Sequence, residues 1–234
     1  MDNSTSPVLL DRKKSALLSV FRKVYVWMTL ALCITGLTAM VVANNDRIIY
    51  ELLQNSLLFW GIIIAEVALV FVISGMVARL SMTTATLLFI LYSVLNGVTM
   101  SLIFLAYTES TIASTFFITA GTFGALSIYG YMTKKDLSSW GSILGMALLG
   151  LIIASLVNVF MENESLYWII SYAGVLLFVG LTVYDTQKIK KAMLDPSNEV
   201  DENLHKTALM GALSLYLDFI NLFLYLLRIM GNRD

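Results

Sequence analysis

Residues 207–229 read TALMGALSLYLDFINLFLYLLRI, an apolar run in which Asp218 and Arg228 are the charged residues. An α-helix needs about 20 mostly apolar residues to cross the roughly 30 Å of hydrocarbon in a bilayer. This stretch is long enough, and it carries far less charge than a helix on the surface of a soluble protein. It therefore predicts a transmembrane helix.

Similar runs recur along the whole chain and predict an all-α integral membrane protein, a bundle of seven transmembrane helices. The connections between these runs are short and rich in turn and cap residues, with one longer connection at 186–206. We expect the spans at Val24–Ala43, Leu57–Ala78, Thr86–Tyr107, Ile112–Met132, Trp140–Met161, Leu166–Asp185 and Thr207–Ile229.

The composition excludes several classes of protein. The 234 residues are 58% hydrophobic and 13% charged, with a mean hydropathy of +0.80, whereas a soluble domain is about 25% charged. The net charge is -1, so the chain has no excess of basic residues of the kind that nucleic-acid binding needs. The expected partner of most of the surface is the lipid bilayer.

Lysine and arginine predict the orientation, because short loops rich in these residues stay in the cytoplasm. They cluster before the first span and in alternate loops after it, at Arg12, Lys13, Lys14, Arg22, Lys23, Arg79, Lys134, Lys135, Lys188, Lys190, Lys191 and Lys206. We therefore expect a cytoplasmic N-terminal arm at 1–23, a transmembrane domain at 24–230 with a cytoplasmic loop at 186–206, and a short C-terminal tail at 231–234.

Acidic residues inside the spans are the strongest functional signal. A charged side chain near the bilayer centre costs about 2.5 to 3.5 kcal/mol, so such residues usually face the bundle interior and serve a function. Glu66, Asp185 and Asp218 all fall within predicted spans. In the last span, polar and small residues recur at helical spacing and form one stripe, comprising Gly211, Ser214, Asp218, Asn221, Tyr225 and Arg228.

The two aspartates are the groups most expected to meet, because both lie on the polar stripes of consecutive helices. Two nearby carboxyl groups in a low dielectric cannot both ionise cheaply, so they would share a proton and respond to pH. Deprotonated, they offer the oxygen ligands that suit Ca²⁺. We expect a pH sensor and tentative calcium site at Asp185 and Asp218, with an ion path along Glu66, Asn96, Ser214 and Asn221.

Two segments resemble the signature of a known family. GLTVYDTQKI at 180–189 and LSLYLDFINLFLYLLR at 213–228, supported by MTKKDLS at 132–138 and AEV at 65–67, are similar to the Bax inhibitor-1 family, the transmembrane Bax inhibitor motif proteins. The likeness is greatest to the bacterial inner-membrane branch. It implies a seven-helix fold with the last helix central, and a Ca²⁺ leak governed by a di-aspartyl pH sensor matching Asp185 and Asp218.

The resemblance also implies a latch, a basic residue at the cytoplasmic end of the second helix that holds the aspartate of the sixth helix in the closed state. Counting from Glu66, the matching position is Val77, and Arg79 follows two residues later. Arg79 is therefore the candidate latch, and closure in this chain could differ from that in the family.

Other functions stay open as alternatives. Some bacterial relatives resemble modulators of a membrane-bound AAA protease, which predicts a protease partner, and a proton-coupled small-solute carrier would also use buried carboxylates. We expect no enzymatic activity and no cofactor beyond calcium as a transported ion, since the single histidine, His205, falls in the charged loop. The acids of that loop are expected to form a solvated face: Asp195, Glu199, Asp201 and Glu202.

Overall fold

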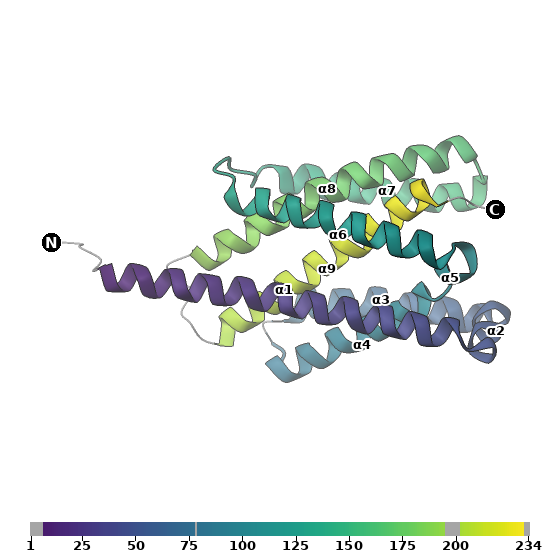
Figure 1. The fold of residues 1–234 in the computed structure, drawn as a ribbon, viewed down its shortest axis with the longest axis horizontal. Helices are drawn as coiled ribbons and strands as arrows, with labels where there is room; N and C mark the ends of the chain where they lie inside the picture. The colour runs from purple at the N-terminus through teal and green to yellow at the C-terminus, as the bar shows by residue number, and fades with distance from the viewer. Residues whose placement is uncertain (1–6, 78, 195–201, 232–234) are drawn as a thin grey trace.

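The computed structural model of the chain describes residues 7–77, 79–194 and 202–231, and these residues form helices joined by short connections (Figure 1). The helices are α1 (Pro7–Ala43), α2 (Asp46–Gln54), α3 (Ser56–Met76), α4 (Met82–Met100), α5 (Ile103–Ala106), α6 (Glu109–Met132), α7 (Trp140–Met161), α8 (Glu164–Leu194) and α9 (Glu202–Met230).

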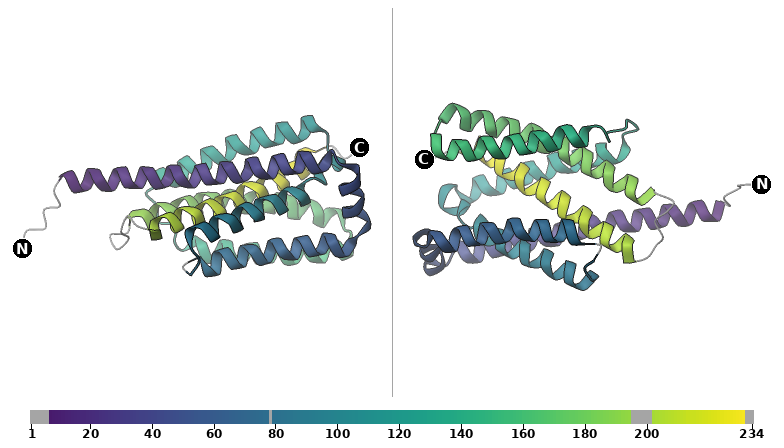
Figure 2. Two further views of the ribbon diagram at one scale, coloured as in Figure 1. Left: turned by 90° about the horizontal axis from the view of Figure 1, so that it is seen from below. Right: turned by 180° about the vertical axis from the view of Figure 1, so that it is seen from behind.

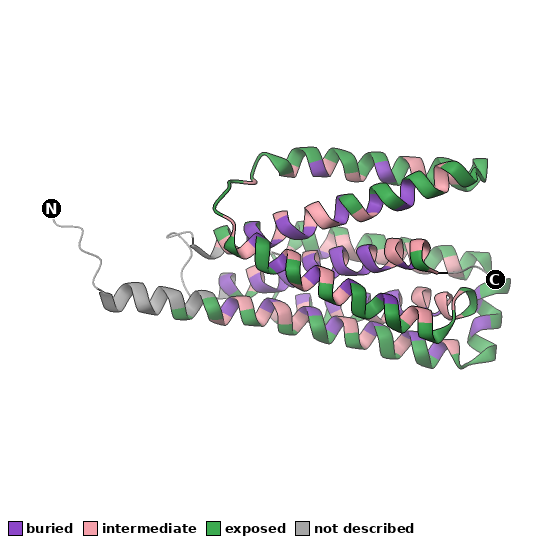
Figure 3. Ribbon diagram, turned by 45° about the horizontal axis from the view of Figure 1, so that its top comes forward, coloured by how far each residue is buried: buried purple, intermediate pink, exposed green. Residues whose placement is uncertain are grey.

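Seven spans are long and apolar enough to cross a membrane, as the sequence predicted. They run through α1, α3, α4 together with α5, α6, α7, α8 and α9. The chain is therefore an all-α, multi-pass membrane protein. Exposed residues cover the outer sides of the bundle, where apolar side chains meet lipid, and buried residues face inward (Figure 3).

The last helix, α9, runs diagonally through the middle of the bundle (Figure 1). It packs against α8, α1, α6 and α4. Of its most apolar window, 61% is buried, against 6% for α3 and 11% for α7. The central position expected for the last helix is confirmed, and α3 and α7 lie at the periphery with most of their surface toward lipid.

One helix was not anticipated from the sequence. Between the first two spans the chain forms α2, which begins where the side chain of Asn45 accepts a hydrogen bond from Ile48 N at 3.2 Å. Ile49 and Leu52 of α2 are buried against the ends of neighbouring helices. An N-cap residue followed by apolar residues at helical spacing is the signal that could have predicted it.

The predicted third span is interrupted near its end. Ser101 is fully buried, and its hydroxyl donates to Val98 O at 2.6 Å, which satisfies a carbonyl that the helix would otherwise use. The backbone of Ser101 and Leu102 stays helical in its dihedral angles, and the span continues as the short helix α5. Serine hydroxyls compete in this way with the regular backbone ladder.

The long loop predicted at 186–206 is wrong in extent. Helix α8 continues to Leu194, and α9 already begins at Glu202. The polar residues after Asp185 remain helical because a helix satisfies its own backbone hydrogen bonds as well in water as in lipid. Residues 195–201, with the predicted solvated acids Asp195, Glu199 and Asp201, lie outside the described residues, as do the N-terminal residues 1–6 and most of the predicted tail, 232–234.

Candidate functional site

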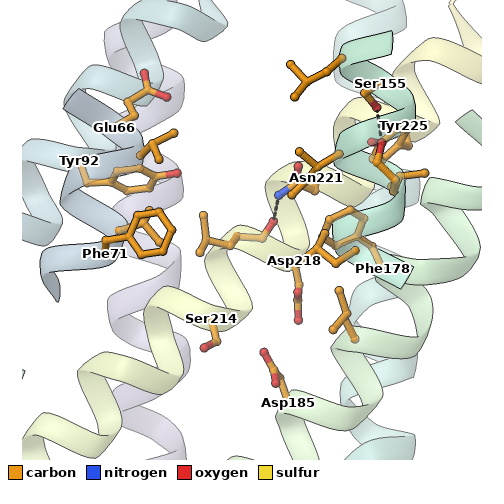
Figure 4. A pocket seen from close by; sticks show the side chains of 18 of the residues that line it. Glu66, Phe71, Tyr92, Ser155, Phe178, Asp185, Ser214, Asp218, Asn221 and Tyr225 are labelled. Atoms are coloured by element: carbon orange, nitrogen blue, oxygen red, sulfur yellow. Dashed lines mark hydrogen bonds between the residues drawn. The ribbon is translucent and has the colours of Figure 1, made fainter. Parts of the chain in front are cut away.

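A cavity of about 650 Å³ lies between the peripheral helices α3 and α7, with α8 and α9 forming its inner wall (Figure 4). Its lining is mostly apolar, which is usual for a ligand cavity with a few placed polar groups. The polar groups are Glu66, Tyr92, Ser155, Asp185, Ser214, Asp218, Asn221, Tyr225 and Arg228. All three acids singled out from the sequence line this one cavity.

The structure brings the two aspartates together. Asp185 comes from α8 and Asp218 from α9, and their carboxyl groups point toward each other across the inner wall (Figure 4). They are close enough to interact electrostatically, and Asp185 also interacts with the ammonium group of Lys188. The meeting that helical periodicity predicted is present, although its role in gating remains a prediction.

Asp218 is an unusual buried group. Its side chain is 4% exposed, and its Oδ2 atom has no hydrogen-bond partner among the described residues. Buried polar atoms are nearly always hydrogen-bonded, and those that are not often have a chemical role. The free oxygen is available to a proton, a water molecule or a cation.

Helical periodicity explains why these groups share one wall. Ser214, Asp218, Asn221, Tyr225 and Arg228 recur every three or four residues along α9, and all of them line the cavity. The sixth member of the predicted stripe, Gly211, lies outside the cavity. A side chain there would collide with Ile189, which lies within 3.0 Å of an added Cβ atom, so glycine permits the close approach of α8 to α9.

Glu66 is held on the opposite wall by a partly buried network. Thr99 Oγ1 donates to Glu66 Oε1 at 3.0 Å, and Asn96 Nδ2 donates to Glu66 Oε2 at 3.4 Å. The hydroxyl of Tyr216 donates to Asn96 Oδ1 at 3.0 Å and lies 2.7 Å from Thr35 Oγ1. Asn96 therefore does not line the cavity, contrary to its predicted place in the ion path, because both ends of its amide are engaged behind Glu66.

The candidate latch does not reach the site. Arg79 is exposed after the end of α3, it does not line the cavity, and the ion pair found among the described residues is between Lys191 and Asp136. Val77, the matching position, is the C-cap of α3. In this conformation no basic residue of α3 holds Asp185.

Close to Asp185, hydrogen bonds join α8 to the connection between α6 and α7, and the sequence analysis did not predict them. Gln187 of α8 is buried; its Nε2 donates to Lys135 O at 2.7 Å and its Oε1 accepts from Leu137 N at 2.9 Å. Lys190 donates to Tyr131 O at 2.6 Å, and Lys191 pairs with Asp136. These bonds tie the α6–α7 connection to α8, and a polar residue on the buried side of a helix was the available signal.

The single histidine is also placed differently from the prediction. His205 lies in the first turns of α9 rather than in a loop, and its side chain lies beside α1, where Lys23 Nζ is 3.1 Å from His205 Nδ1. It is exposed and outside the cavity. His205 thus belongs to the contact between α1 and α9.

The aspartates could supply part of a calcium site. Ca²⁺ takes about six to eight oxygen ligands, and no group of three or more acidic, histidine or cysteine side chains suited to a metal occurs in the described part of the chain. A cation at the pair would therefore need neutral oxygens in addition. Ser214 and Asn221, predicted in the ion path, line the same cavity.

The sequence profile described as "Inhibitor of apoptosis-promoting Bax1" matches residues 17–234. The chain belongs to the Bax inhibitor-1 family. It is 50% identical to "Inner membrane protein YbhL" of Escherichia coli K12, with 100% of both chains covered. It is 47% identical to an uncharacterized protein of Borreliella burgdorferi, with 90% of each chain covered, and 36% identical to an uncharacterized membrane protein of Streptococcus pyogenes, with 97% and 98% covered.

Membership of the Bax inhibitor-1 family agrees with the resemblance drawn from the two signature segments. Both segments lie within the matched residues, one in the second half of α8 and the other along α9. In space they form the inner wall of the cavity. The parts of the sequence that identify the family are therefore the parts that bring the two aspartates together.

Proposed function

We propose that the chain is a pH-sensitive calcium leak channel of the Bax inhibitor-1 type, gated by the carboxyl pair of Asp185 and Asp218. The observation that carries this proposal is the pair itself: two acids from adjacent transmembrane helices point at each other in a cavity, and one has an unpartnered oxygen. Placing acids within spans is costly and usually functional.

The pair supplies both parts of the proposed activity. While the two carboxyl groups share a proton, they carry one negative charge and hold α8 and α9 together. Loss of that proton leaves two like charges, which repel each other across the cavity wall and at the same time form a stronger site for a divalent cation. The protonation state thus changes both the helix contact and the affinity for Ca²⁺.

Location and orientation belong to the same proposal. The similarity to a protein named for the inner membrane supports a bacterial inner membrane location. The alternate connections that carry most lysines and arginines lie at the end of the bundle where α1 begins, which supports a cytoplasmic N-terminus.

The test is calcium entry into liposomes that contain the purified full chain and a trapped Ca²⁺ indicator. We expect flux that changes several-fold between acidic and alkaline buffer. Asp185→Asn and Asp218→Asn should each remove most of that pH response, because a neutral amide neither shares a titrating proton nor repels its neighbour.

Asp136→Asn is the matched control, because Asp136 is exposed and outside the cavity. It should keep the pH response. Flux that ignores pH, or a pH response that survives both cavity substitutions, would contradict the proposal. Absence of flux together with binding to a membrane protease would favour the alternative of a protease modulator.

A further inference from the structure

The cavity is open on the side that faces lipid. Seen from behind, α9 lies between α3 and α7, and no other helix crosses in front of it (Figure 2). The cavity between these helices has a rim of exposed apolar side chains, Val67 and Phe71 on α3 and Ile152 and Leu156 on α7. In a bilayer this rim lies within the hydrocarbon, so the opening leads from the acyl chains to the polar wall of α9.

The opening is apolar at its rim and polar at its inner wall. The inner wall carries Asp218, Asn221 and Ser214, and the amide of Asn221 donates to Leu217 O at 2.8 Å. The apolar rim, which lies outside the polar wall, suits an occupant that is apolar where it meets the rim. Acyl chains are the molecules that surround this opening in the membrane.

A positively charged side chain, that of Arg228, lines one end of the same cavity. Arg228, in the last turn of α9, lies over the rings of Tyr167 and Tyr225, with its guanidinium carbon 5.5 Å and 5.3 Å from the two ring centres. Its guanidinium group has no carboxylate partner within salt-bridge distance among residues 7–77, 79–194 and 202–231. Guanidinium binds phosphate through paired hydrogen bonds, so this end of the cavity suits a lipid headgroup.

The distance along α9 between Asp218 and Arg228 fits the length of a lipid in one leaflet. Arg228 lies ten residues beyond Asp218 on α9, which is about 15 Å at 1.5 Å per residue. That distance is close to half of the roughly 30 Å hydrocarbon core. A chain held at Arg228 by its phosphate would reach the level of Asp218.

We propose that the cavity is a phospholipid site: one lipid from the leaflet at the Arg228 end places its phosphate on Arg228 and one acyl chain between α3 and α7. The chain packs against the apolar rim formed by α3 and α7. The occupant thus closes the lateral opening without a second protein chain. This site goes beyond the proposed calcium leak, because it is measured without any ion flux.

The test is native mass spectrometry of the purified full chain after titration with 1-palmitoyl-2-oleoyl-phosphatidylglycerol in detergent. We expect one lipid to remain bound after excess lipid is removed. Ile152→Trp, which fills the groove, should lower its occupancy about tenfold. Ile153→Trp is the matched control, since Ile153 is exposed on α7 but does not line the cavity, and it should keep the lipid.

A second pair repeats the comparison one turn further along α7. Leu156 lines the cavity and Val157 does not, although both are exposed, so Leu156→Trp should lose the lipid and Val157→Trp should keep it. Arg228→Gln should lower phosphatidylglycerol occupancy about tenfold, and Arg228→Lys should retain part of it.

Three outcomes would overturn the site: equal lipid retention in the groove and control variants, no retained lipid in the unchanged chain, or a lipid-free dimer. Whether or not lipid is retained, the pH response of calcium flux still tests the gating proposal. Loss of the pH response in Asp218→Asn likewise says nothing about lipid retention. The two proposals can therefore fail separately.

Discussion

The two sides of α9 differ in how completely their groups are satisfied. On the side toward α1, α4 and α6, Leu215 and Tyr216 are fully buried, and the hydroxyl of Tyr216 has partners in Thr35 and Asn96. On the cavity side, Asp218 is equally central, yet one of its oxygens has no partner. The comparison indicates that the first side holds the bundle together and that the second side is arranged to bind something.

The largest effect on stability should come from the packed side. Leu215→Ala removes a fully buried side chain, and the resulting cavity should lower the free energy of unfolding by on the order of 2 kcal/mol, since in lipid the loss of packing remains although the transfer from water does not contribute. Unfolding in mixed micelles of mild detergent and dodecyl sulfate measures this.

The control for that substitution is Leu149→Ala on α7, where the leucine is 62% exposed to the surroundings of the bundle and does not line the cavity. It should change the unfolding free energy very little. Equal losses at Leu215 and Leu149 would show that the two environments do not differ as described.

A smaller effect should follow from breaking the polar network of the packed side. Tyr216→Phe keeps the ring and its edge-to-face contact with Tyr92, whose centre is 5.7 Å away, but removes the donor to Asn96 and the partner of Thr35. We expect a loss of about 1 kcal/mol, typical of a buried hydrogen bond between membrane helices, in the same unfolding assay.

Tyr92→Phe provides the comparison, because Tyr92 lines the cavity and its side chain reaches the wall near Glu66 (Figure 4). Its hydroxyl makes no hydrogen bond within the described part of the chain, so the substitution should cost less than Tyr216→Phe. The reverse order would contradict the assignment of the complete network to the packed side.

The smallest effect should appear where α8 leaves the membrane. Lys191, which donates to the carboxylate, and the backbone N–H of Ser138 hold the pKa of Asp136 well below its usual range. Because that pKa is lower in the folded than in the unfolded chain, the contact stabilises the folded form at neutral pH, and this contribution is lost as the pH falls below the ordinary carboxyl pKa toward the lowered one.

We therefore expect acidification to lower the protection factors of the backbone amides of residues 133–139, which compare the observed exchange with the intrinsic rate at each pH. Salt should do the same, since the pair is exposed. Asp136→Asn should have lower protection factors at neutral pH, and these should change less on acidification. An unaltered pH profile in Asp136→Asn would mean that this ion pair does not secure the connection. The bonds of Gln187 to the same connection, which do not titrate, should persist in both forms.

The sequence alone determined the membrane class, the approximate spans and the side of each helix on which the two aspartates lie. Each of these follows from local rules: apolar runs of sufficient length must lie in lipid, and residues three or four positions apart share one side of a helix. The stripe on α9 could be predicted because Ser214, Asp218 and Asn221 interrupt an otherwise apolar helix. The end of α8 and the start of α9 could not be predicted, because a polar segment outside the membrane can either continue a helix or form a loop.

The tertiary structure decided which polar residues face the cavity and which are used for packing. Asn96 and Glu66 both appear as polar residues in apolar runs, yet Tyr216 and Thr35, distant in sequence, fix Asn96 behind Glu66. The lateral opening depends on where α3 and α7 lie relative to α9, and Gln187 became an attachment only because the α6–α7 connection lies beside it. These features arise from contacts between helices remote in the chain, and no local pattern encodes such contacts.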